Sequence, residues 1–166
     1  MIINVLEYLE NSEEKVPAKI AFAEENSSIS YSALVDNGKR IASCIINNTN
    51  YARKKPIVVF VDRDIVSLAS FIAIAYSGNF YVPIDTQMPK LRIELILKTL
   101  QPIAALVRNS DVEYVRSISS ELLIIVYEDA IKYHIDIKKL SEIRRNTIDT
   151  DPLYATFTSG STGIPK

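Results

Sequence analysis

The sequence predicts an α/β fold in which helices cover both faces of a mostly parallel sheet. Residues 56–61 form a continuous apolar run, as expected for a strand that is buried on both faces. Segments with apolar residues at helical spacing alternate with such runs, which implies right-handed crossovers between parallel strands. The 166 residues suffice for one domain with a substantial core, and no linker-like stretch interrupts them. We therefore expect residues 1–166 to form a single α/β domain.

The chain begins with a predicted helix and hairpin. Residues 2–9 place apolar side chains at helical spacing and should form a short amphipathic helix. Short extended pieces at residues 19–23 and 28–30 flank the polar turn at residues 24–27. This arrangement predicts a β-hairpin.

A longer helix is predicted over residues 31–46. Ser30 precedes it and can cap its first turn by accepting a hydrogen bond from a backbone N–H group. Three aliphatic side chains should face inward: Leu34, Ile41 and Ile45. Cys44, the single cysteine, lies among them and is interpreted as a small buried hydrophobe, not as a reactive thiol.

The middle of the chain predicts a helix at residues 65–76 and a strand at residues 80–84, with Gly78 ending the helix. A further helix should follow, capped by Asp85 or Thr86, with Pro89 near its first turn. Three leucines mark the side of this helix that we expect to be buried: Leu91, Leu95 and Leu100.

The last third predicts two strands, a polar region with one helix, and a final strand. In order, these segments cover residues 103–107, 122–126, 128–151 (helix at 137–145) and 153–157. The final strand runs directly into a loop rich in glycine, serine and threonine.

Charge and composition limit the classes of function. The formal net charge is −1, so no field recruits nucleic acid or an anionic membrane. The start of the chain has no basic leader and no apolar run is long enough to cross a bilayer, so we expect a cytoplasmic protein. The only histidine, His134, lies in a polar segment and is interpreted as a surface residue; with a single distant cysteine, no protein-built zinc site is expected.

Two of the four glycines, Gly160 and Gly163, lie in the last residues of the sequence, TSGSTGIPK. Glycine lets the backbone approach an anion closely, successive N–H groups can form a cationic nest, and hydroxyl groups and a lysine add further donors. A strand that leads into such a loop is therefore a candidate phosphate site. The spacing fits neither a Walker loop nor GxGxxG, and composition alone is equally compatible with an ordinary polar loop.

The segment TSGSTGIPK resembles the phosphate loop of the adenylate-forming (AMP-dependent synthetase and ligase) superfamily, whose pattern is roughly YTSGSTGxPKG. This sequence has Phe157 in place of the tyrosine and lacks the last glycine. Residues 29–34 are similar to the early (T/S)YxEL segment of the family, but Ala33 replaces its glutamate. Residues 76–85, YSGNFYVPID, followed by Pro89, look like the KAGxAYVPIDPxxPxxRI segment, in a form typical of amino-acid adenylation domains and D-alanine–carrier protein ligases.

The resemblance implies an ATP-dependent ligase. In this family a carboxylic acid, here most closely an amino acid, reacts with ATP and Mg²⁺ to give an acyl adenylate and pyrophosphate. A thiol on the phosphopantetheine of a carrier protein or on coenzyme A then takes the acyl group. By the same resemblance, the β- and γ-phosphates would be held by Thr158, Ser159, Gly160, Ser161, Thr162, Gly163 and Lys166.

The matched motifs belong to the N-terminal part of a family enzyme, and the family places its catalytic and metal-binding residues further along. We therefore expect an incomplete N-terminal subdomain that ends at the phosphate loop, has no catalytic residue or metal ligand of its own and is inactive alone. An unpaired edge at the last strand would favour self-association. Two alternatives stay open: an acyl- or aryl-CoA synthetase, and a non-catalytic remnant that serves as a binding module.

Overall fold

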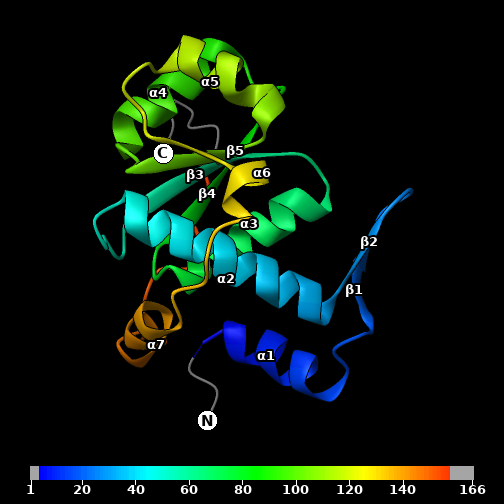
Figure 1. Cartoon of the computed structure of the whole chain (residues 1–166). Coiled ribbons are helices and arrows are strands. Elements are labelled where there is room, and N and C mark those ends of the chain that lie inside the picture. The colour runs from blue at the N-terminus through cyan, green and yellow to red at the C-terminus, as the bar shows by residue number, and fades with distance from the viewer. Residues whose placement is uncertain (1–3, 158–166) are drawn as a thin grey trace.

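A four-stranded parallel sheet forms the centre of the molecule (Figure 1). The computed structural model describes residues 4–157. The strand order is β4-β3-β5-β6, with strands at Pro56–Val61 (β3), Phe80–Asp85 (β4), Ala104–Val107 (β5) and Ile124–Val126 (β6). The register pairs Val58 of β3 with Val82 of β4 and with Ala105 of β5. The α/β class and the parallel sheet are thus as predicted.

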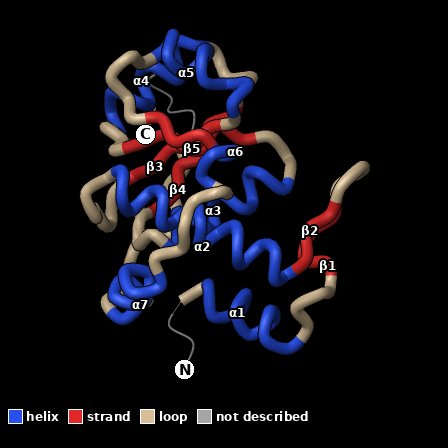
Figure 2. The backbone as a smooth tube through the Cα atoms, in the orientation of Figure 1, coloured by secondary structure: helices blue, strands red, loops and turns tan. Residues whose placement is uncertain are grey.

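Helices cover both faces of this sheet, and Figure 2 shows the strands between them. One face packs against α2 (Tyr31–Asn48), α3 (Ile65–Tyr76) and the short α6 (Tyr127–Ala130). The other packs against α4 (Lys90–Leu100) and α5 (Val112–Ile118). Successive residues of a strand point to opposite faces, so Ile57 and Val58 enter different clusters although both are fully buried. This two-sided burial explains the continuous apolar run of β3.

Two further helices form an outer layer on α2 and α3. They are α1 (Leu6–Lys15) and α7 (Ile137–Arg145), far apart in the sequence but both contributing to one apolar cluster. The buried members of this cluster are Leu6, Ala42, Ile46, Tyr76, Leu140 and Ile143. The antiparallel hairpin of β1 (Ile20–Ala23) and β2 (Ser28–Ser30) extends outward between the end of α1 and the start of α2, and a 3₁₀ turn, η1 (Asn109–Asp111), precedes α5.

Most predicted elements have the expected limits, and their caps follow from the sequence. Ser30 accepts a hydrogen bond from the backbone N of Ala33 at 3.3 Å, which confirms the cap of α2. Asp64 caps α3 in the same way, accepting from Ser67 N at 2.9 Å. The first helix is displaced: it begins at Leu6 and continues to Lys15, whereas the apolar spacing predicted residues 2–9. The second half of α1 lies at the surface and is polar, so the apolar spacing did not extend to it. None of the helices within residues 4–157 is both long and apolar enough to cross a membrane.

The helix after β4 differs from the prediction in its start and in its buried side. It begins at Lys90, and Asp85 ends β4 instead of capping the helix; its Oδ1 accepts from Gln87 N at 2.8 Å within the turn. Leu91 and Leu95 are 75% and 46% exposed, so the prediction is wrong for these two leucines, whereas Leu100 is half-buried and packs against the core. The residues that face the sheet are Ile93, Ile96 and Leu97. Helix α5 was not predicted; at seven residues, VEYVRSI is too short to show a clear helical period.

Candidate functional site

The structure describes the chain up to the start of the candidate loop. The predicted phosphate-binding residues lie outside the described residues: Thr158, Ser159, Gly160, Ser161, Thr162, Gly163 and Lys166. What the described structure supplies is the segment that leads to them, residues 148–157, and the edge of the sheet along which this segment runs.

The leading segment runs parallel to β4 on the outer edge of the sheet. Tyr81 N donates to Leu153 O and Ala155 N donates to Tyr81 O, each at 3.1 Å, which makes a parallel bridge between Tyr81 and Tyr154. This is one bridge and not the predicted five-residue strand. The next donor in such a parallel ladder would be the backbone N of residue 83, and Pro83 has no N–H group. The proline therefore limits the pairing, as expected on an edge strand.

Side chains hold the segment on both sides of the sheet. The ring of Tyr154 stacks on Tyr81 with centroids 5.8 Å apart, and Tyr81 stacks on Phe71 of α3 at 4.3 Å. Burial, with a smaller contribution from Tyr154, raises the pKa of the Tyr81 phenol. Ala155 and Phe157 pack on the opposite side, against the cluster that includes Val82 and Ile84. The segment thus runs alongside β4, in the same direction, toward the carboxyl ends of the parallel strands.

An acidic anchor lies just before this segment. Lys54 Nζ is 2.7 Å from Asp151 Oδ1, and Ile148 N donates to Asp151 Oδ2 at 3.2 Å. The hydrogen bond from the Lys54 ammonium lowers the pKa of the Asp151 carboxyl. Asp151 N also donates back to Ile148 O at 3.1 Å, which closes a compact turn. The chain is therefore fixed to the loop before β3 immediately ahead of the bridge.

Gly78 and Asn79 fix the start of β4 against the same loop. Gly78 has φ of 72°, and a Cβ there would lie 2.8 Å from Ile143 Cγ2 of α7, so glycine meets both a conformational and a packing requirement. Asn79 is buried, accepts from Lys55 N at 3.0 Å and donates to Ala52 O at 3.0 Å. These contacts give a structural reason for the Gly-Asn pair within YSGNFYVPID.

Charged side chains gather at the carboxyl ends of β3 and β5. The guanidinium of Arg108, which follows β5, pairs with Asp64, and its Nη1 lies 3.5 Å from Asp62 Oδ2. The two aspartates follow β3, and β3 and β5 are neighbours in the sheet. Arg108, Asp62 and Asp64 were not predicted as site residues. The signal that could have found the aspartates is the presence of acidic side chains directly after a buried strand.

The cysteine and histidine have the places predicted for them. Cys44 is buried on α2, and burial raises the pKa of its thiol. His134 is exposed. Within residues 4–157, no group of three or more His, Cys, Asp or Glu side chains is placed to hold a metal ion.

Comparisons with known proteins agree with this geometry. The family model described as "AMP-binding enzyme" matches residues 9–166. The D-alanine–D-alanyl carrier protein ligase of Listeria monocytogenes serotype 4a is 31% identical over 172 residues, covering 100% of this chain and 32% of that protein. Tyrocidine synthase 1 of Brevibacillus parabrevis is 24% identical over 163 residues, covering 98% of this chain and 15% of that protein. The chain thus spans about a third of the length of the first of these curated relatives.

A solved structure shares the fold. The N-terminal subdomain of Klebsiella oxytoca NpsA superposes with a TM-score of 0.79 at 18% identity, covering 100% of this chain and 42% of that one. At this identity the likeness supports the fold alone. Because the family model matches residues 9–166, which is nearly the whole chain, the chain belongs to the AMP-binding enzyme family.

Proposed function

We propose that this chain is the N-terminal part of an ATP-dependent ligase that activates an amino acid as its acyl adenylate. The family membership supports adenylate chemistry, and relatives whose names specify D-alanine and tyrocidine support an amino acid as the carboxylic substrate. A carboxylate oxygen of the substrate would attack the α-phosphorus of ATP, and the bond from that phosphorus to the bridging oxygen of pyrophosphate would break.

The loop at residues 158–166 would hold the β- and γ-phosphates during this step. The single observation that carries this proposal is the parallel bridge of Tyr154 with Tyr81, which directs the chain toward the carboxyl edge of the sheet. Ligands of open parallel sheets bind at this edge. Backbone N–H groups, four hydroxyl groups and Lys166 would position the phosphates and neutralise the charge of the leaving pyrophosphate.

The described frame fits this role because it fixes where the loop starts. Asp151, Tyr154 and Phe157 are each held by side-chain contacts to the sheet or to the loop before it. The Mg²⁺ that accompanies ATP would be held by the phosphates and by one or two carboxylates, which we expect outside residues 4–157. Arg108 and its two aspartates would line the same edge and set its charge.

We further propose that the 166-residue chain does not catalyse adenylation by itself. It covers 32% of the Listeria ligase, so the groups that bind the amino acid and transfer the acyl group to a carrier-protein phosphopantetheine thiol would come from additional sequence. Amino-acid-dependent exchange of pyrophosphate into ATP tests both parts. The chain alone should give no exchange, whereas a protein that carries this chain and the remaining two thirds should respond to amino acids. Exchange with aryl or fatty acids alone would contradict the choice of substrate, and turnover by the isolated chain would contradict its inactivity.

A further inference from the structure

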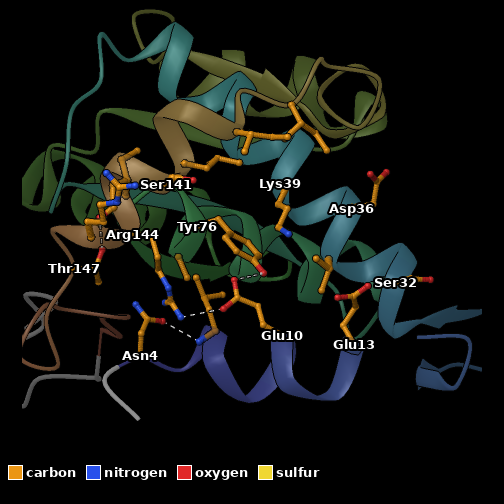
Figure 3. Close-up of a pocket in the computed structure, with 18 residues that line it drawn as sticks. Asn4, Glu10, Glu13, Ser32, Asp36, Lys39, Tyr76, Ser141, Arg144 and Thr147 are labelled. Carbon is orange, nitrogen blue, oxygen red and sulfur yellow. Dashed lines mark hydrogen bonds and ion pairs between the residues drawn. The ribbon is translucent and has the colours of Figure 1, made fainter. Parts of the chain in front are cut away.

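A cavity of about 730 Å³ lies between α1, α2, α3 and α7, on the outer side of the helical layer (Figure 3). It is separated from the sheet by α2 and α3, and its walls include no residue of the Arg108 cluster or of the bridge to β4. Its volume is within the range of small-molecule sites, about 300–1,000 Å³. Nothing in the proposed adenylation chemistry uses it.

The floor of this cavity is a polar network, in which Arg144 Nη1 is buried without a hydrogen-bond partner among the described residues. Tyr76 OH donates to Glu10 Oε1 at 3.2 Å, and Arg144 Nη2 donates to Glu10 Oε2 at 3.1 Å. Burial and the neighbouring Glu10 raise the pKa of the Tyr76 phenol. The phenol therefore stays neutral, and Glu10 is paired with Arg144, whose Nη2 also lies 3.7 Å from Glu7 Oε1. Another charged lining residue, Asp36, pairs with Arg40 at 2.6 Å.

Two half-buried charged side chains of the lining are left without such partners in the described part of the chain; Arg145, which also lacks one there, is exposed. Lys39 extends from α2 and Glu13 from α1 toward the same space, as Figure 3 shows. Both are half-buried, and neither makes an ion pair or a hydrogen bond to a side chain in the described part of the chain; the ammonium of Lys39 lies only over the ring of Tyr76, at 5.9 Å from its centroid. A cation and an anion thus face one cavity from separate helices.

The rest of the lining is mixed, with uncharged polar residues and an apolar surface. The side chains that provide this apolar surface include Leu6, Val35, Ala75, Ile135, Leu140 and Ile143. A molecule that matches the cavity needs an anionic group for Lys39, a cationic group for Glu13 and an apolar body between or beside them. We propose that this cavity binds a zwitterion with an apolar body of about the size of a hydrophobic dipeptide.

The proposal is tested on the 166-residue chain by calorimetric titration with leucyl-phenylalanine. The zwitterion should bind saturably at one site. N-acetylation of the peptide removes its cation and amidation removes its anion, and each should weaken binding about three- to ten-fold, the loss expected for one half-exposed charge contact. Absence of saturable binding, or equal binding of all three peptides, would overturn the proposal.

Variants locate the contacts. Glu13→Gln should weaken binding of the zwitterion by the same factor but leave the N-acetyl peptide unaffected, because that peptide has no cation to lose. Lys39→Met should weaken binding of the zwitterion and leave binding of the amidated peptide unchanged. Glu14→Gln on the same helix and Lys98→Met on α4, both at exposed positions, are matched controls that should change nothing. If the controls weaken binding as much as the test variants, the cavity is not the site. None of these results depends on ATP, so their failure would leave the ligase proposal intact.

Discussion

Tyr81 and Tyr154 stack with their ring centroids 5.8 Å apart, and the same two residues form the parallel bridge that joins the end of the described chain to β4. One side-chain contact and two backbone hydrogen bonds thus set the direction in which the chain enters the candidate phosphate loop.

Replacing Ala155 by proline should release the leading segment from β4. The substitution removes the N–H group that donates to Tyr81 O and should greatly lower the protection of the Tyr81 amide, whose acceptor is Leu153 O. Hydrogen exchange read by mass spectrometry or NMR measures this loss. Thr156→Pro is the matched control, because Thr156 N makes no hydrogen bond in the described structure. Equal protection in both variants would show that the bridge does not hold the segment.

Gly78→Ala should lower the free energy of unfolding by about 2–4 kcal/mol, the sum of a left-handed backbone conformation and an overpacked contact. Both causes are present, since φ is 72° and a new Cβ would lie 2.8 Å from Ile143 Cγ2. Urea denaturation of the single variants and of the double variant with Ile143→Ala separates them. If the double variant loses as much free energy of unfolding as the two single variants together, the contact with α7 does not cause the destabilisation.

Asn79→Asp should destabilise the fold by about 2–4 kcal/mol at neutral pH, because it places a buried oxygen against acceptors. In the native turn Asn79 Nδ2 donates to Ala52 O at 3.0 Å and to Ser77 Oγ at 3.1 Å. Asn11→Asp, at an exposed position on α1, serves as the control for the added charge. Similar unfolding midpoints for the two variants would contradict the role given to Asn79.

The ion pair of Lys54 and Asp151 should make the free energy of unfolding depend on pH in the acidic range. The pKa of Asp151 is lowered in the folded chain from its ordinary value of 3.8, so its contribution is complete above that value and is lost as the pH falls through the lowered pKa. Because Lys54 is half-exposed, the contribution should not exceed about 1 kcal/mol. Asp151→Asn should remove this part of the pH dependence between about pH 5 and pH 2. An unchanged profile would show that the pair contributes nothing to stability.

The sequence predicts helices well where a cap residue and a wide apolar face agree. Ser30 before α2 is such a case, and α3 and α7 have the predicted limits. The prediction of the buried side fails for α4, because this helix carries apolar residues on more than one face. Leu91 and Leu95 compete there with Ile93 and Ile96 for the buried side, and only packing against the sheet decides between the two faces.

The candidate site was predictable in its motif but not in its supporting contacts. The spacing of glycine, serine and threonine in residues 158–166 is local, so it is visible in the sequence. The contact of Gly78 with Ile143 and the ion pair of Lys54 with Asp151 join residues that are distant in the chain. No periodicity reports such pairs. The effect of Pro83 on the edge of the sheet became clear from the bridge beside it.

The most direct test of the central claim is an NMR titration of the 166-residue chain with ATP and Mg²⁺, compared with AMP. The loop should respond weakly but specifically to the β- and γ-phosphates, so the amides of Gly160 and Gly163 should shift with ATP and not with AMP. Lys166→Ala should abolish these shifts, and Lys98→Ala, at an exposed position on α4, should leave them unchanged. Equal shifts with AMP, or shifts that persist without the lysine, would contradict the claim that this loop binds the phosphates of ATP.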